Sequence, residues 1–169
     1  MDVLQVLKEG HEKVRSLYAQ TESSLQSKDL KAVFDELFSS VKEQIYLEKG
    51  YLYPEIEGLF SEAEAFVNAG LHRQKALEKS FSSLSESLCS PVSEENAGSV
   101  SKKVAELSGK LMTHLDQTDQ VLFPKIRQLI STPDREDLGQ QFMELRAELR
   151  KRVAASEDLS PPQKQKKRA

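Results

Sequence analysis

Several residue types are scarce in this chain, and each scarcity excludes a class of protein. The sequence contains one cysteine, Cys89, so no internal disulfide can form, which fits a reducing compartment. No segment approaches the roughly twenty consecutive apolar residues that a membrane-spanning helix needs. The start of the chain has neither the basic residues nor the apolar core of a signal peptide. We therefore expect a cytoplasmic protein without a disulfide framework and without a membrane partner.

The charge balance argues against a nucleic-acid partner. The 169 residues include 27 acidic and 24 basic side chains, and the net charge is -3. Four basic residues lie in the final segment, so residues 1–160 carry the same 27 acidic side chains against 20 basic ones. A mildly acidic body of this kind is not typical of a nucleic-acid-binding surface. The sequence also lacks a glycine-rich phosphate loop and any pattern of nucleophilic catalysis, so we predict no catalytic residue.

Two segments of the chain, seventy residues apart, resemble each other. The first reads QIYLEKGYLYPEI over residues 44–56, and the second reads HLDQTDQVLFPKI over residues 114–126. Each carries Leu-aromatic-Pro at the same offset, and a proline ends or bends a helix because its ring clashes with the carbonyl four residues back. In each copy an amide or imidazole side chain precedes a carboxylate by about one helical turn: Gln44 and Glu48, then His114 and Asp119. This arrangement is a candidate metal-binding face.

Apolar residues recur at three- and four-residue steps along most of the chain, which is typical of amphipathic helices. The spacing predicts helices over about residues 2–25, 29–58, 61–88, 93 or 99 to 130, and 132–155. No segment shows the period-two alternation of a strand. We therefore predict an all-α protein, an up-down-up-down four-helix bundle with an additional C-terminal helix that packs outside the bundle or extends it.

The length predicts one domain. A chain of 169 residues can bury one real core but is short for two domains of ordinary size. We place this domain at residues 1–156 and predict that residues 157–169 are a disordered basic tail. Such a tail could contact an acidic partner, although a basic end of this kind is more often simply solvated.

The three histidines, His11, His72 and His114, each lie on or next to the apolar stripe of a different predicted helix. Glu48 lies on the stripe of the remaining helix, and a buried carboxylate is costly unless a cation or strong donors compensate it. A single histidine on an apolar face is usually a satisfied core residue. Four helices that each carry a metal-competent side chain favour a metal site, because imidazoles and carboxylates of facing helices often meet at iron, zinc or manganese.

In order and spacing, these residues resemble the hemerythrin-like, or HHE cation-binding, family. The resemblance rests on the histidine order, on the spacing of four from Gln44 to Glu48 and of five from His114 to Asp119, and on the doubled Leu-aromatic-Pro. It covers residues 1 to about 130. It implies a four-helix bundle around a non-haem di-iron centre with five histidines and two bridging carboxylates. It also implies a role in binding or sensing dioxygen, nitric oxide or iron.

Position by position, the resemblance implies metal ligands at His11, Glu48, His72, His114 and Asp119. Two positions depart from the pattern, because Gln44 and Ala76 stand where the family has histidines. Gln44 could supply a weak carbonyl ligand or hold a bound water, whereas Ala76 offers nothing. Asp119 lies about 140° around an ideal helix from His114, so it would have to reach in from the neighbouring stripe. A tyrosine near this level could substitute for a missing imidazole: Tyr46, Tyr51 or Tyr53.

Two functions follow from this interpretation. The first is a metal-binding protein with a di-iron or incomplete di-iron site, or with another divalent metal. The alternative is a bundle that has kept the fold, lost the metal and works as a protein-interaction module. A ferritin-like di-iron enzyme fits less well, because its paired Glu-x-x-His motifs are absent from the sequence.

Overall fold

The computed structural model describes residues 1–154, so the predicted tail and the last two residues of the predicted domain lie outside the described part. The elements are α1 (Val3–Ser23), α2 (Leu30–Leu47), the π-helical segment η1 (Glu48–Leu52), α3 (Tyr53–Ile56), α4 (Ala63–Ser87), α5 (Ala97–Gln117), the π-helical segment η2 (Thr118–Leu122), α6 (Phe123–Leu129) and α7 (Thr132–Ala154). Residues 1–154 contain no strand. The prediction of an all-α protein is confirmed.

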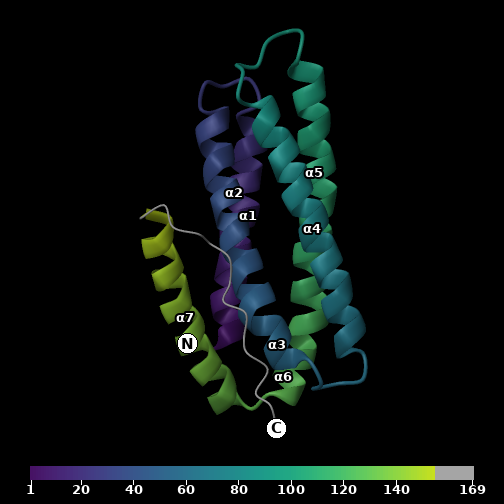
Figure 1. The fold of residues 1–169 in the computed structure, drawn as a ribbon, viewed down its shortest axis with the longest axis vertical. Helices are drawn as coiled ribbons and strands as arrows, with labels where there is room; N and C mark the ends of the chain where they lie inside the picture. Colours follow the sequence, from purple (N-terminus) through teal and green to yellow (C-terminus); the bar gives the residue numbers. More distant parts are fainter. Residues whose placement is uncertain (155–169) are drawn as a thin grey trace.

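The elements combine into four long helical rods that lie side by side as a bundle (Figure 1). The first is α1, and the second runs through α2, η1 and α3 without a break. The third is α4, and the fourth runs through α5, η2 and α6. α1 packs along α2, and α4 packs along α5, while α7 lies outside the four rods against α1 and α2. The prediction of an up-down-up-down bundle with an additional C-terminal helix is confirmed.

Polar contacts attach α7 to the first turns of α1. Arg135 Nε lies 2.7 Å from Asp2 Oδ2, and Arg135 Nη1 donates to the carbonyl oxygen of Ile130 at 2.6 Å. Further along α7, Arg146 Nη2 donates a hydrogen bond of 3.1 Å to the carbonyl oxygen of Val6. The extra helix therefore lies against the N-terminal end of α1.

Both π-helical segments lie just before the proline of a repeated segment. The amide of Tyr53 bonds to the carbonyl of Glu48, and the amide of Phe123 bonds to the carbonyl of Thr118, five residues back in each case. A wider turn accommodates a proline ring that would otherwise clash with the preceding turn. The sequence left open whether each proline ends or bends its helix. The prolines do not end the rods: the helix widens for one turn and continues.

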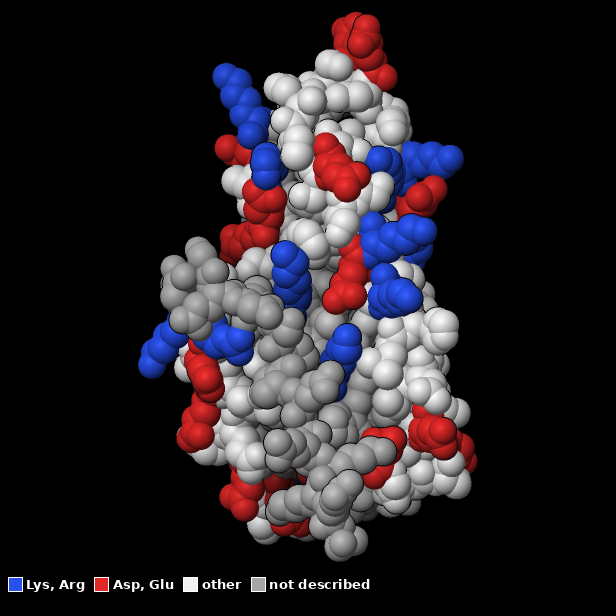
Figure 2. Space-filling model, in the orientation of Figure 1, with Lys and Arg blue, Asp and Glu red and all other residues white. Residues whose placement is uncertain are grey.

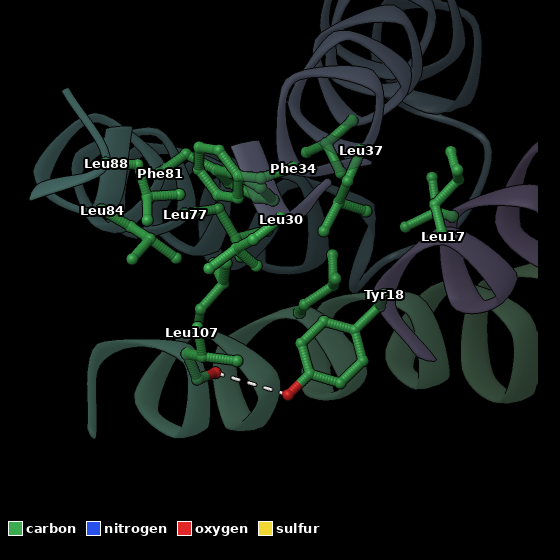
Figure 3. Close-up of a cluster of buried hydrophobic side chains, with 14 of the residues drawn as sticks. Leu17, Tyr18, Leu30, Phe34, Leu37, Leu77, Phe81, Leu84, Leu88 and Leu107 are labelled. Atoms are coloured by element: carbon green, nitrogen blue, oxygen red, sulfur yellow. Dashed lines mark hydrogen bonds between the residues drawn. The ribbon is translucent and has the colours of Figure 1, made fainter. Parts of the chain in front are cut away.

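Hydrophobic side chains fill the bundle in two clusters. The cluster shown in Figure 3 lies between the second half of α1 and helices α2, α4 and α5. The rings of Phe34 and Phe81 lie 5.7 Å apart in it, and the Tyr18 hydroxyl lies 3.4 Å from the carbonyl oxygen of Val104. The other cluster surrounds the π-helical segments and the start of α1. The two clusters make a core that covers most of the length of the bundle.

Between the clusters lies a layer of buried polar side chains, which we call the polar layer: His11, Gln44, Glu48, Gln74, His114 and Thr118. Its position is clear on α1, where His11 falls between Leu7 of one cluster and Val14 of the other. Burying such groups is costly unless they are paired. The polar layer is therefore the part of the core in which a function should be sought.

The described residues on the face that Figure 2 shows give no comparable signal. Acidic and basic side chains are intermixed on the face that Figure 2 shows, without a continuous field of one sign. The expectation that the chain has no nucleic-acid partner remains a prediction. Within residues 1–154, none of the helices combines the length and the apolar character that crossing a membrane requires.

Candidate metal centre

Glu48, the first residue of η1, lies at the centre of the polar layer and is fully buried. Its Oε1 atom lies 3.3 Å from His11 Nε2. Its Oε2 atom lies near three groups: His114 Nε2 at 2.9 Å, Gln74 Nε2 at 2.8 Å and the Tyr53 hydroxyl at 3.4 Å. An ionised carboxylate has about four lone-pair positions. These four neighbours therefore satisfy the hydrogen-bonding capacity of Glu48.

The surroundings of Glu48 keep it ionised although it has no contact with water. Burial alone would raise the pKa of Glu48, but the charge of His114 and the hydrogen bonds of His11 and His114 outweigh it and lower the pKa well below its usual range. Burial and the nearby carboxylate raise the pKa of Tyr53, so its hydroxyl keeps the proton that it donates to Glu48. The core thus holds a negative charge that depends on its imidazole neighbours.

His11 lies between two carboxylates, one at each ring nitrogen. Its Nδ1 atom is 2.6 Å from Asp119 Oδ1, and its Nε2 atom is 3.3 Å from Glu48 Oε1. The ring of Phe123 stacks on the imidazole at a centroid distance of 5.7 Å. Burial alone would lower the pKa of His11, but the hydrogen bonds and charges of Asp119 and Glu48 raise it to about 9. At neutral pH and without a metal, His11 is therefore a cation that donates to both carboxylates.

Asp119, the second residue of η2, reaches toward α1. One of its oxygens contacts His11, and the other lies 2.8 Å from Arg15 Nη2, which also lies 3.0 Å from Asp116. The Asp119 side chain is 24% exposed, whereas Glu48 is fully buried. Asp119 thus reaches His11 from η2, at the ring nitrogen opposite to the one that faces Glu48. The polar layer meets solvent at this edge, between α1 and α5.

α4 contributes Gln74 to the polar layer, and the expectation that His72 faces the core is wrong. His72 is exposed, whereas Gln74 is 2% exposed. Positions two residues apart differ by about 200° around a helix, so these side chains lie on nearly opposite sides of α4. Ala76 is half-buried and has no ligand atom. The buried stripe of this helix is Gly70, Gln74, Leu77, Phe81 and Leu84.

Two glycines make room for polar side chains of the site. A Cβ atom on Gly70 would lie 2.4 Å from the Tyr53 hydroxyl oxygen, and one on Gly10 would lie 2.0 Å from Gln44 Nε2. Both distances are far shorter than a van der Waals contact. The missing side chain at position 70 therefore lets Tyr53 reach Glu48, and the one at position 10 lets the buried Gln44 amide lie against α1.

The repeated Leu-aromatic-Pro was a sequence signal for two aromatic contacts of the site that we did not predict. The repeated Leu-aromatic-Pro places an aromatic residue of each copy in the site: Tyr53 contacts Glu48, and Phe123 stacks on His11. Tyr46 and Tyr51, the other tyrosines considered as ligands, pack against each other at 5.8 Å. No pattern in the sequence distinguished Arg15 from the other basic residues, because its role depends on Asp116 and Asp119, which only the packing of the helices brings close to it.

The family model described as Hemerythrin HHE cation binding domain matches residues 2–126. The chain belongs to this family. The match ends at the last residue of the second repeated segment, and it includes His11, Glu48, His114 and Asp119. Searches of the curated proteins and of the solved structures found no match. The predicted resemblance is confirmed, and the family is one whose domains bind metal cations, typically iron.

The polar layer of this member of the hemerythrin HHE family does not fit a centre with five histidines and two bridging carboxylates. It holds two imidazoles, and α4 presents Gly70 and Gln74, one turn apart, on its buried side. Asp119 contacts the nitrogen of His11 that is opposite to the one facing Glu48. A second bridging carboxylate is therefore not in place. The ligand roles implied for His11, Glu48, His114 and Asp119 remain predictions.

A single cation fits the donor chemistry better. Two imidazole nitrogens and one carboxylate converge, and three buried atoms of the polar layer lack a hydrogen-bond partner among the described residues: Gln44 Oε1, Gln74 Oε1 and His114 Nδ1. Residues 1–154 contain no group of three or more His, Cys, Asp and Glu side chains spaced to hold a metal ion, and the imidazoles contact Glu48 directly. A cation would have to replace the protons that these imidazoles share with Glu48.

Proposed function

We propose that this hemerythrin-family chain binds one divalent transition-metal cation, with iron as the foremost candidate, through His11, Glu48 and His114. The observation that carries the proposal is the approach of two imidazole Nε2 atoms, from two other rods, to the two oxygens of one buried carboxylate at 3.3 and 2.9 Å. Two histidines and one carboxylate are the ligands of many non-haem ferrous proteins. Iron held there would supply a redox-active centre, and the proposed small-molecule ligands are dioxygen and nitric oxide.

Cation binding at this point competes with protons. A ligating imidazole must be neutral and must present a lone pair to the metal, so binding releases the protons that face Glu48. The pKa of His11, raised to about 9 by its two carboxylate partners, means that a cation must displace a proton at neutral pH. We therefore expect an affinity that is modest at neutral pH and rises with pH.

The test is the metal content of the purified full chain after anaerobic reconstitution with ferrous iron. We expect about one iron per chain, in line with one set of two imidazoles and a carboxylate. H114A should lose this iron, whereas H72A should keep it, since His72 is the histidine outside the polar layer. A chain that retains no iron, or that loses it equally in H72A and H114A, contradicts the proposal. Two irons per chain with oxo-bridge absorption would restore the di-iron hypothesis.

A second candidate function is a metal-free bundle that acts as a protein-interaction module. One observation favours it: Glu48 has four donors without any cation, so its hydrogen bonding is complete as it stands. A ligand that binds only the folded state must raise the melting temperature. This candidate therefore predicts that saturating ferrous iron, zinc and manganese leave the melting temperature unchanged. A rise that disappears in H114A would exclude it.

A further inference from the structure

We propose that Asp119, held by Arg15, is a positioning residue for His11 and is not itself a ligand of the cation. Its role is to bind the Nδ1–H group of His11 so that the Nε2 atom faces Glu48 and His114. The part of this inference that concerns the metal rests on the proposed function, but the orientation of His11 can be tested without any metal.

The two nitrogens of His11 face two different carboxylates. Nδ1 lies 2.6 Å from Asp119 Oδ1, and Nε2 lies 3.3 Å from Glu48 Oε1. These nitrogens point to different sides of the imidazole ring, so Asp119 and Glu48 lie on different sides of His11. A histidine that binds a metal commonly donates its other N–H to a carboxylate, which fixes the tautomer and the ring orientation. Asp119 has the position of that outer carboxylate.

Arg15 holds Asp119 in place. Arg15 lies one helical turn after His11 on α1, so both side chains lie on the same face of that helix. Its Nη2 atom is 2.8 Å from Asp119 Oδ2 and 3.0 Å from Asp116 Oδ1, and its Nη1 atom is 3.5 Å from Met112 Sδ. The guanidinium is thus anchored to α5 at two further points. Asp119 is bound through both oxygens, one to each of the two α1 side chains.

The other imidazole of the polar layer lacks such a partner. His114 Nε2 faces Glu48, but no hydrogen-bond partner of its buried Nδ1 atom occurs among residues 1–154. His11 is held at both nitrogens and on one ring face by Phe123. Removing Asp119 should therefore change His11 and leave His114 unchanged, which gives the experiment an internal comparison.

The first measurement uses the metal-free full chain and long-range proton–nitrogen NMR of the imidazole rings. Three histidines give three sets of signals, and the exposed His72 is the reference. We expect a hydrogen-bonded Nδ1–H signal for His11 in the wild type and in D116A, which removes only the outer partner of Arg15. D119A should lose this signal, and D119N, which keeps an oxygen acceptor, should retain it in part. An unchanged His11 signal in D119A overturns the inference.

The second measurement is the affinity for cobalt(II), whose visible spectrum reports its ligands. We expect D119A to bind cobalt about 10- to 100-fold more weakly than the wild type, the usual effect of losing an outer carboxylate. The spectrum of the saturated D119A protein should keep its intensity, because the ligand set is unchanged, and D119N should recover part of the affinity. D116A should bind like the wild type. A spectrum whose intensity changes in D119A, or equal affinities of D119A and D116A, overturns the inference.

The failure of the proposed function is distinguishable from the failure of this inference. If the wild type binds no cobalt at all, the proposed function fails, and the NMR comparison of D119A with D116A still decides whether Asp119 orients His11. If the wild type binds cobalt and D119A shows wild-type NMR signals and affinity, the proposed function stands and the positioning role fails. The near-isosteric D119N keeps the test valid if D119A does not fold.

Discussion

Raising the pH of the metal-free protein from about 6 to about 9.5 should lower its free energy of unfolding, because His11 loses the proton that it shares with Asp119 and Glu48. The pKa of His11 is about 9 in the folded chain, against an ordinary value of 6.5 for a histidine side chain. A group whose pKa is raised by folding contributes stability that is complete below its unfolded pKa and is lost as the pH passes its folded pKa. A difference of this size corresponds to about 3 kcal/mol, at about 1.4 kcal/mol for each pKa unit.

Urea denaturation in the presence of a chelator, measured at half-unit steps of pH, checks this expectation. Most of the decrease in the stability of the wild type should fall between about pH 7 and about pH 9.5. H11Q, which cannot change its charge, should be less stable at pH 6 and show a much smaller slope, whereas H72A should follow the wild type. A flat wild-type profile, or an equal slope in H11Q, would refute the reasoning. The pH series should stay below about pH 10, because tyrosines of the unfolded chain ionise above that value and would add their own pH dependence.

Three further predictions concern the groups around Glu48. G70A should destabilise the chain although alanine is the better helix former, because its Cβ would lie 2.4 Å from the Tyr53 hydroxyl. The control G109A has open space around the new Cβ atom and should stabilise the chain by up to about 1 kcal/mol. Urea denaturation of both variants measures the two effects. Y53F should cost about 1 kcal/mol by removing one of the donors to Glu48, and a stability equal to the wild type would show that this contact is not formed. E48Q should cost roughly 3–5 kcal/mol in the metal-free chain, because it leaves the His11 cation without its buried partner, and thermal melting should show a much lower midpoint.

The rods of the bundle were predictable from apolar spacing, but the polar residue that α4 contributes to the site was not. Its buried stripe passes from Gly70 through Gln74 to Leu77, so no large apolar side chain marks the stripe between the first and the last of these residues. A pattern with this gap does not show which polar residue is buried; we placed His72 on or next to the buried stripe, whereas the buried polar residue is Gln74. The error follows from composition: a site residue that is polar weakens the periodic signal that would locate it.

The contacts within the site depend on information that periodicity does not contain. The angle between His114 and Asp119 was predictable from helical geometry, and it indicated a carboxylate on a neighbouring stripe. Its partners, His11 and Arg15, depend on how far α1 and α5 slide along each other, and one sequence does not specify that offset. The repeated Leu-aromatic-Pro came closest to showing the site, because both aromatic residues contact it.

Protonation and cation binding involve the same atom of His11, and this gives a last prediction that joins stability to metal binding. The apparent affinity for ferrous iron should rise about tenfold for each pH unit below about pH 9, because one proton must leave His11 for each cation that binds. The stability of the metal-free chain should fall over the same pH range in which the affinity rises, and both should level off above about pH 9. Anaerobic titrations at about pH 6.5, 7.5 and 8.5, beside urea denaturation of the same samples, compare the two curves. If the affinity does not depend on pH while the stability does, the cation binds elsewhere in the chain, and His11 serves only as the counter-charge of Glu48.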